Sequence, residues 1–422
     1  MTESKQNSNV IPIIMMYFMF FMIAFVTNLA GSMGVVVKAQ FGVSNALAQL
    51  GTFVNFIAYA CMGIPAGIIA KRKGYKFTGL AAILVGILGV GVQLISGFAA
   101  SFAVYVVGAF IAGFSMCMLN TVVNPLLNTI GGGGNRGNQL IQFGGVCNSV
   151  GGTLAPYLVG WIVGGTVANA QVIQVVPVMV IAMLIFALAF VVLLFTKIPE
   201  PHMETAEERA ARLSGNVQKN AHSPLSFRHF VLGAIAIFFY VGVEVGIPNT
   251  ANLYMSNLPS VGPAVAGTFV AAYWLFMLFG RLIGASVGGK VSSKAMLTTV
   301  GTIALLFVLC IMFIPESATV PFRGAQVPVK MIFMVCCGLC TSVMWGNIFN
   351  LAAEGLSKYT APASGIFMTL VCGGGILTVV QNAVADGAGY MASYIVPAIG
   401  LIYILLFALV GSKNVNKDIP TE

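Results

Sequence analysis

Residues Met179–Phe195 read MVIAMLIFALAFVVLLF, an unbroken apolar run without a single charged side chain. A second apolar run covers Leu401–Val410. Runs of this kind, when they approach twenty residues, satisfy their backbone hydrogen bonds inside a lipid bilayer by forming helices. A barrel strand would instead alternate apolar and polar residues over about ten positions. These stretches therefore predict membrane-spanning helices and exclude a β-barrel.

The rest of the chain has the same character. Of its 422 residues, 58% are hydrophobic and only 7% are charged, whereas a soluble domain has about 25% charged residues. A chain so poor in charge cannot cover a water-exposed surface, so lipid must be its main solvent. The apolar stretch that begins at Ile11 is too long for a cleaved signal, and we interpret it as the first span.

Twelve spans are predicted, in two sets of six. We expect an all-α membrane protein with a six-helix bundle over residues 1–196, a cytoplasmic linker over 197–227 and a second bundle over 228–422. A glycine followed by basic residues recurs after the second and the eighth span, which suggests a duplicated unit. The predicted spans are 11–37, 47–70, 77–98, 101–129, 138–163, 171–196, 228–255, 263–288, 294–314, 328–352, 361–384 and 390–411.

The positions of lysine and arginine predict the orientation. With both termini in the cytoplasm, only Lys38, Arg323 and Lys330 of the 20 Lys and Arg residues lie outside, as the positive-inside rule requires. Membrane orientation then explains the net charge of +9, and no nucleic-acid partner is expected. We predict a multi-pass monomer in the lipid bilayer of the inner membrane.

Acidic residues are nearly absent from the predicted spans. Glu244 is the only one well inside a span. A charge near mid-membrane costs at least about 2.5 kcal/mol on insertion scales, so it normally faces a cavity and serves function. We interpret Glu244 as the binding group for a coupling cation, Na⁺ or H⁺. The alternative is a glutamate that pairs with an arginine or the backbone and locks helices together.

Side-chain amides recur in the spans of both halves. An amide carries a donor and an acceptor, which suits a polyhydroxylated neutral ligand such as a sugar, and aromatic rings can stack on a sugar ring. The alternative is that the amides bridge helices inside the hydrocarbon. The predicted substrate-binding residues are Asn28, Asn120, Asn124, Gln142, Asn148, Tyr240, Trp274, Asn347, Asn350 and Gln381.

Histidine and cysteine predict neither a metal nor a cofactor. All three histidines lie in or just beyond the linker, and Cys337 and Cys340 form a CxxC without a second pair or a histidine nearby. Small core residues are the better interpretation of these cysteines. The spans offer one carboxylate and no acid–base pair, so we predict that the protein is not an enzyme.

Several motifs add a resemblance to a known family. The loop Pro65-Ala-Gly67…Lys73-Gly74-Tyr75-Lys76 and the motifs Asn124-Pro125, Asn148-Ser149-x-Gly151, Phe239-Tyr240-Val-Gly-Val-Glu244-Val and Tyr273-Trp274 with Gly280-Arg281 resemble the fucose permease-like branch of the major facilitator superfamily. This branch includes bacterial glucose/galactose transporters. The resemblance covers nearly the whole chain and implies the major facilitator fold, in which two pseudo-symmetric six-helix bundles rock around a central sugar site. It also implies conformational gating by Gly67, Arg72, Gly74 and Arg281.

The chain departs from that branch at informative positions. Gly31 and Asn120 stand where fucose permease has proton-carrying carboxylates, so neither that proton route nor fucose as substrate is carried over. We predict a secondary active transporter that imports a monosaccharide or sugar derivative, coupled to Na⁺ or H⁺. A facilitative sugar uniporter and an exporter of small amphiphiles on the same fold are the alternatives.

Overall fold

The computed structural model describes residues 10–130, 134–164, 170–200, 203–214, 223–287, 291–356, 359–416 and 418–419. Eleven of its helical segments are long and apolar enough to cross a membrane by length and composition. The helices of the first half are α2 (Val10–Phe41), α3 (Asn45–Ala48), α4 (Leu50–Ala99), α5 (Phe102–Ile130), α6 (Gly134–Val163), the 3₁₀ turn η2 (Val172–Val175) and α7 (Val176–Phe195).

Helix α4 contains two membrane spans. Its 50 residues would be about 75 Å long as one straight helix, more than twice the hydrocarbon core of about 30 Å. Gly74 divides it, with φ 86° and ψ 168° inside the helix. The backbone N–H groups of Tyr75 and Lys76 then donate to the Glu200 carboxylate at 2.5 and 2.8 Å, which fixes the turn to the segment that follows α7.

The second half has more interruptions. After the short linker helix α8 (Ala206–Leu213) and the turn η3 (Pro224–Ser226), three of its spans are interrupted, at Ser342-Val343, at Val371-Cys372 and at Tyr394. Its helices are α9 (Arg228–Ser256), α10 (Gly262–Val287), α11 (Ser293–Phe313), α12 (Lys330–Thr341), α13 (Met344–Ala353), α14 (Thr360–Leu370), α15 (Gly373–Ala388), α16 (Tyr390–Ser393), α17 (Ile395–Leu406) and η5 (Phe407–Gly411).

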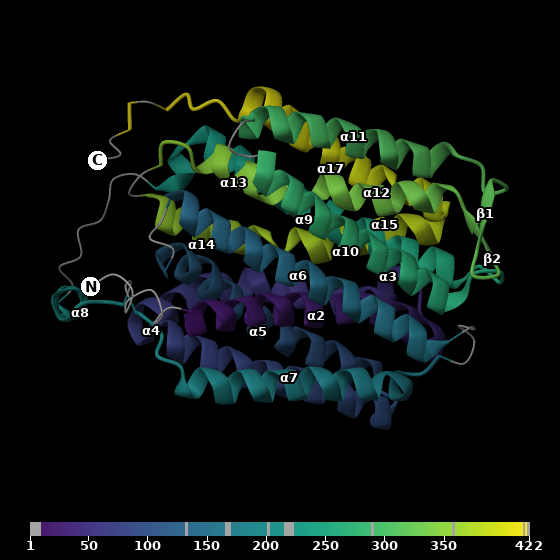
Figure 1. The fold of residues 1–422 in the computed structure, drawn as a ribbon, viewed down its shortest axis with the longest axis horizontal. Coiled ribbons are helices and arrows are strands. Elements are labelled where there is room, and N and C mark those ends of the chain that lie inside the picture. Colours follow the sequence, from purple (N-terminus) through teal and green to yellow (C-terminus); the bar gives the residue numbers. More distant parts are fainter. Residues whose placement is uncertain are drawn as a thin grey trace.

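A β-hairpin between α11 and α12 was not predicted. Strands β1 (Thr319–Phe322) and β2 (Ala325–Pro328) pair antiparallel, with Val320 opposite Val327. Arg323 and Gly324 form the turn with φ of 50° and 81°, and positive φ at both central residues is what tight hairpins require. Figure 1 places this hairpin at one end of the molecule and α8 at the other. We call these the hairpin end and the linker end.

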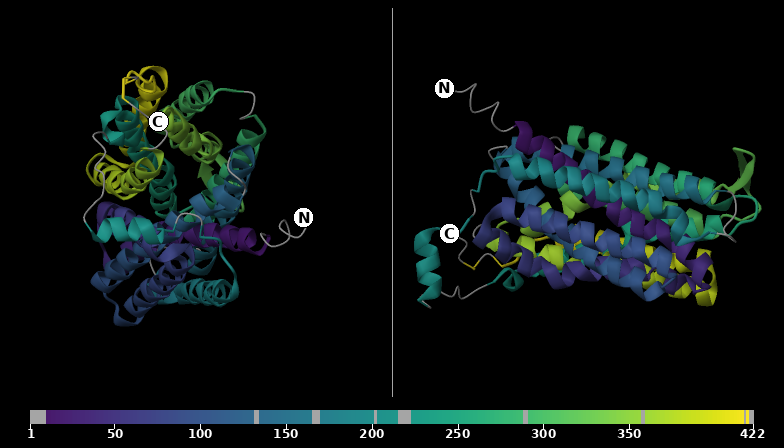
Figure 2. Two further views of the ribbon diagram at one scale, coloured as in Figure 1. Left: turned by 90° about the vertical axis from the view of Figure 1, so that its left-hand side faces the viewer. Right: turned by 90° about the horizontal axis from the view of Figure 1, so that it is seen from below.

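The helices form two bundles that meet along a seam. In Figure 1, α2, α4, α5 and α7 lie together below, and α9, α11, α12, α13 and α17 lie above. Figure 2 (left) looks along the helices and shows the two groups side by side. Small residues let α6 and α10 approach closely across the seam: a Cβ atom on Gly160 would lie 2.7 Å from the carbonyl oxygen of Pro263, as is common where helices associate in membranes. This arrangement confirms the predicted two six-helix bundles, with α4 supplying two spans. The residue boundaries 196/197 and 227/228 stay a prediction.

Candidate substrate and cation site

Glu244 and Arg281 form an ion pair in the seam. Glu244 lies near the middle of α9, and Arg281 reaches it from α10 with 3.9 Å between Nη2 and Oε1. Both side chains are only 14% exposed. Tyr240, one turn earlier on α9, donates its hydroxyl to Glu244 Oε1 at 2.8 Å. The carboxylate thus has a charged partner and a neutral donor, as a charge at this depth requires.

Arg281 also connects the two halves. Its Nη1 donates to the Ser149 hydroxyl at 2.8 Å, to Asn148 Oδ1 at 3.3 Å and to the carbonyl oxygen of Gly145, all on α6. The planar guanidinium has five N–H donors in a fixed fork, which lets one side chain serve several acceptors. The charge analysis counts Arg281 among the cytoplasmic residues, but its head group lies between helices. It brings the predicted cation site into contact with a predicted substrate-binding amide, Asn148.

Aromatic residues surround this pair. Tyr273 donates to the carbonyl oxygen of Glu244 at 3.0 Å and lies 3.0 Å from the Thr341 hydroxyl. Tyr240 packs edge-on against Trp345, with ring centroids 6.1 Å apart. These contacts hold α9 against α10, α12 and α13, so the position of Glu244 is set by three neighbouring helices.

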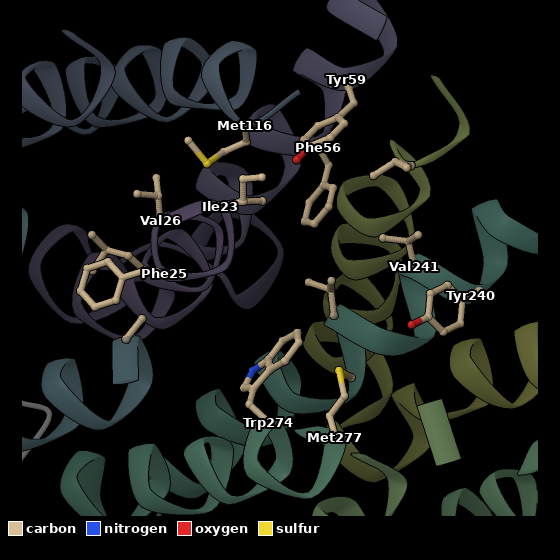
Figure 3. Packing of buried hydrophobic residues seen from close by; sticks show 14 of the residues in the cluster. Ile23, Phe25, Val26, Phe56, Tyr59, Met116, Tyr240, Val241, Trp274 and Met277 are labelled. Carbon is tan, nitrogen blue, oxygen red and sulfur yellow. The ribbon is translucent and has the colours of Figure 1, made fainter. Parts of the chain in front are cut away.

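More rings line the seam nearby. Figure 3 shows Phe56 of α4 on one side and Trp274 and Met277 of α10 on the other, directed toward the region between them, while the Tyr59 hydroxyl turns toward α5 and accepts from Asn120. The Trp274 indole lies on the bare backbone of α6, where a Cβ on Gly152 would come within about 3.0 Å of the ring. Among the described residues, nothing accepts a hydrogen bond from Trp274 Nε1. The seam therefore offers aromatic surfaces of the kind that pack against sugar rings.

Five of the predicted amides donate to groups of their own or of a neighbouring helix. The Nδ2 atoms of Asn28, Asn124 and Asn347 donate to carbonyl oxygens four residues earlier, at 2.9, 3.1 and 2.9 Å. Asn120 also donates to the Tyr59 hydroxyl at 2.9 Å and so links α5 to α4. Asn148 donates to the carbonyl oxygen of Phe20 at 3.1 Å. These five amides are thus satisfied as donors, and those of Asn120 and Asn148 bridge helices as the alternative interpretation expects.

Some predicted residues do not join this group. Asn350 is exposed and lines a separate cavity of about 730 Å³ at the linker end, together with Lys294 and Glu354. Arg72 is exposed, and a Cβ on Gly67 would meet nothing within 4 Å. The side chain of Gln142 lies outside the described residues.

A polar cluster at the hairpin end was missed by the sequence analysis. The Asp386 carboxylate at the end of α15 accepts the backbone N–H groups of Asn45 and Ala46 on α3, at 2.8 and 2.9 Å. Lys38 Nζ donates to Asn45 Oδ1 at 2.6 Å and to the Tyr390 hydroxyl at 3.1 Å, and that hydroxyl donates to Asn45 Oδ1 at 2.8 Å. We call Lys38, Asn45, Ala46, Asp386 and Tyr390 the latch, because it joins the first half to the second. The one hint in the sequence is the single acid Asp386 near the end of a span.

A second contact lies deeper in the seam. Asn249 of α9 donates to Gln49 Oε1 at 3.2 Å and is 3.5 Å from the Thr52 hydroxyl. Closer to the hairpin end, α2, α6, α9 and α10 enclose a cavity of only about 10 Å³, lined by Ser32 and Asn252 among others. The seam is therefore closed to anything larger than a water molecule at this place.

This arrangement defines a class of protein: a polytopic membrane transporter made of two bundles, with a charged and amide-lined site in the seam between them. The chain belongs to the Major Facilitator Superfamily, whose sequence profile matches residues 14–379. Members of this family move solutes and perform no chemistry on them, so the chain is a transporter and not an enzyme.

Curated relatives match over almost their full length. A "Glucose/galactose transporter" of Brucella abortus biovar 1 (strain 9-941) is 28% identical over 94% of this chain and 93% of its own. A "Putative glucose/galactose transporter" of Helicobacter pylori (strain ATCC 700392 / 26695) is 26% identical, over 97% and 99%. The "L-fucose-proton symporter" of Escherichia coli (strain K12) is 23% identical, over 98% and 96%.

Solved structures of the family share the fold. The transporter FucP in its outward conformation aligns with a TM-score of 0.67, at 21% identity over 96% of this chain and 100% of that one. A D-xylose-proton symporter aligns with a TM-score of 0.69, at 12% identity over 96% and 99%. The predicted fold and family are thereby confirmed.

Proposed function

We propose that this chain imports a monosaccharide or sugar derivative across the bacterial inner membrane by alternating access, coupled to Na⁺ or H⁺. The observation that carries the proposal is the mid-seam pair of Glu244 and Arg281, 3.9 Å apart and in contact with α6. The pair supports the proposal because a carboxylate, a group that can bind a cation, lies beside the surface where the two halves meet.

The sugar part of the proposal rests on the seam's chemistry and on the relatives. Amides supply the paired donors and acceptors that hydroxyl groups need, and the rings of Phe56, Tyr59 and Trp274 supply apolar faces. The named relatives include transporters of glucose/galactose and of fucose. We assign substrate binding to Asn28, Asn120, Asn124, Asn148, Tyr240, Trp274, Asn347 and Gln381.

The coupling part rests on how Arg281 is shared. Glu244 attracts the guanidinium from one side, and three acceptors on α6 hold it from the other. When a cation neutralises Glu244, the attraction within the pair is lost and Arg281 is held by α6 alone. Ion binding in the second half then changes a contact with the first half. A ligand shifts a conformational equilibrium only through such a differential interaction.

We infer the direction of transport from the proposed orientation in the membrane. With the linker end in the cytoplasm, the basic loops lie inside as the positive-inside rule requires, and the latch lies at the outer surface. Both termini are then cytoplasmic. This conformation is fastened on the outside, which suits release of an imported substrate to the cytoplasm.

Uptake by purified protein in proteoliposomes tests the proposal. Labelled hexoses, deoxyhexoses and N-acetylated and acidic sugars are offered one at a time, with a Na⁺ gradient and a pH gradient applied separately. Glu244→Gln abolishes accumulation above the outside concentration but leaves exchange of labelled for unlabelled sugar, because exchange needs no ion. Glu354→Gln, which changes an exposed acid at the linker end, retains accumulation.

The outcomes separate the alternatives. Full accumulation by Glu244→Gln removes this residue from coupling. Sugar flux in the wild type that ignores both gradients indicates a uniporter. Flux of amphiphilic compounds without flux of any sugar indicates the exporter.

A further inference from the structure

Three buried amides meet on the hairpin side of Glu244. Gln49 is fully buried at the start of α4, Asn249 is 6% exposed on α9, and Gln381 is 1% exposed on α15. Asn249 and Gln49 are hydrogen-bonded across the seam. Gln381 adjoins the same stretch of α9, since a Cβ on Gly246 would lie 2.4 Å from its Oε1. Gly246 and Asn249 are three residues apart and share a face of the helix.

The backbone of α2 makes room for these side chains. A Cβ on Gly31 would lie 2.6 Å from Asn249 Oδ1, and one on Gly34 would lie 2.7 Å from Gln49 Nε2. The two glycines are three residues apart, so they form a single notch on one face of α2. The amides fill this notch, and any larger residue at either position would displace them.

The side-chain nitrogen atoms of two of these amides have no hydrogen-bond partner in the described part of the chain. Among the described residues, neither Gln49 Nε2 nor Gln381 Nε2 has a hydrogen-bond partner, although both atoms are buried. A buried donor left unpaired costs about 1–3 kcal/mol, and unpaired groups in a native structure call for an explanation. Apolar side chains of similar size would avoid this cost. The cost is understandable if the partners arrive in another state of the transport cycle.

Separation of the halves at the hairpin end would supply that state. Gln49 belongs to the first half, and Asn249 and Gln381 belong to the second, so separation breaks the Gln49–Asn249 hydrogen bond and uncovers all three amides together. Each amide then offers two N–H donors and one carbonyl acceptor. This set matches neighbouring hydroxyls of a sugar ring, each of which donates one hydrogen bond and accepts others.

We propose that Gln49, Asn249 and Gln381 form a sugar-binding subsite that is reached from the hairpin end and is closed in this structure by their contacts with one another. The subsite rests on the proposed sugar transport. Asn249 lies five residues beyond Glu244 along α9, or about 7.5 Å at 1.5 Å per residue. A sugar that enters from the outside binds here before it contacts the Glu244–Arg281 pair.

Half-saturation constants measured from the two sides test the subsite. Oriented proteoliposomes receive the transported sugar on the hairpin side or on the linker side. Asn249→Leu and Gln49→Leu raise the half-saturation constant on the hairpin side about tenfold or more, and change that on the linker side less than twofold. Gln326→Leu removes an exposed amide of the hairpin and changes neither value.

If the amides only close the seam, the half-saturation constant on the hairpin side should change in the opposite direction. If the amides only fastened the halves together, their loss would favour the state that is open at the hairpin end. The half-saturation constant on that side would then fall. A fall, no change, or an equal rise on both sides overturns the subsite. Where a leucine variant does not fold, Asn249→Ala and Gln49→Ala are measured instead, with purified monodisperse protein and intact transport from the linker side as evidence of folding.

The subsite and the proposed function fail in different ways. A wild-type protein that moves no sugar from either side removes the proposed function and the subsite with it. A wild-type protein that moves sugar, with variants that keep its half-saturation constants, removes the subsite alone.

Discussion

The two ends of the seam are built differently. At the hairpin end the latch joins the halves by charged and neutral hydrogen bonds, among them those between Asp386 and the backbone of α3. At the linker end, the contact between Glu200 and the turn at Gly74 and the contact between Arg228 and Asn416 each stay within one half. Along α4, a Cβ on Gly63 would lie 3.2 Å from the Thr369 hydroxyl of α14, but one on Gly67 would meet nothing. The halves are thus joined by charged contacts at the hairpin end, whereas the position of Gly67 on α4 faces open space.

This difference shows which contacts oppose the change of conformation. Hydrogen bonds to a charged carboxylate are worth about 1.5–3 kcal/mol each, so the latch contributes stability that opening at the hairpin end must overcome. Among the described residues, no comparable hydrogen bond joins residues 64–70 of α4 to the second half. Binding of substrate and ion must therefore supply the free energy that opens the latch. Arg281 lies between the latch and the linker end.

Locking the latch covalently has the largest expected effect. Asp386 accepts the backbone N–H of Ala46 at 2.9 Å, so Ala46→Cys and Asp386→Cys put two cysteines on facing segments of the two halves, where a disulfide forms when the Cα atoms come within about 4.4–6.8 Å. Oxidation abolishes transport and reduction restores it, in a variant that lacks the exposed Cys61. Each single cysteine variant, treated with the same oxidant, keeps its activity. Transport that continues in the cross-linked protein would mean that the hairpin end need not open.

Removal of the Arg281 charge, which joins the two halves, should have the next largest effect on transport. Arg281→Gln leaves Glu244 without its cationic partner, and breaking a buried pair from one side costs up to about 3–5 kcal/mol. We expect a lower unfolding temperature and transport slowed at least about tenfold. Arg281→Lys keeps the charge but not the planar fork, so it recovers stability better than it recovers transport.

The double variant Arg281→Gln with Glu244→Gln provides the control for this pair. It carries no unpaired charge, so its unfolding temperature rises above that of Arg281→Gln. Equal unfolding temperatures for the two variants would show that the ion pair does not contribute to folding.

Neutralising the latch should shift the balance between the ends. Asp386→Asn loses a charged acceptor for two backbone N–H groups and favours opening at the hairpin end by about tenfold, the equivalent of 1.4 kcal/mol. A cysteine at Ser32, which lines the small cavity in the closed seam, reports this as faster alkylation by a membrane-impermeant reagent. Arg323→Gln, a charge change at the exposed hairpin turn, leaves the rate unchanged. An unchanged rate in Asp386→Asn would mean that the latch does not control opening.

Much of the fold was predictable because the bilayer fixes the length and polarity of a span. The hairpin and the breaks at Ser342-Val343 and Val371-Cys372 were not, since each involves only a few residues and leaves hydropathy unchanged. At the site, Glu244 and Arg281 were both identified, as a cation ligand and a gating residue, and pairing with an arginine was the stated alternative for Glu244. Their contact joins two helices, and no periodicity along the chain predicts it.

Gln381 was predicted as a substrate-binding residue, but the latch and Gln49 were not predicted, for a related reason. Gln49 lies within three residues of a predicted span boundary, where a polar side chain is usually solvated. Its burial depends on Asn249 in the other half, 200 positions away in the sequence. The role of such residues depends on contacts between the two halves, and a single sequence does not predict which residues make those contacts.

The smallest expected effect is the change in stability caused by substitutions at Gly67, where α4 faces open space. It tests the difference between the two ends of the seam. Gly67→Ala meets no neighbour and removes the flexibility of a glycine within a helix, so it stabilises this conformation by about 0.5–1 kcal/mol. The matched variant Gly63→Val, one turn away, pushes against Thr369 and destabilises it. Unfolding temperatures of the two variants in the same detergent measure the contrast. If the halves close on Gly67 in the opposite conformation, a larger residue there, Gly67→Leu, slows transport without lowering the unfolding temperature. A Gly67→Leu variant with full transport would place the moving contact of the linker end elsewhere on the seam.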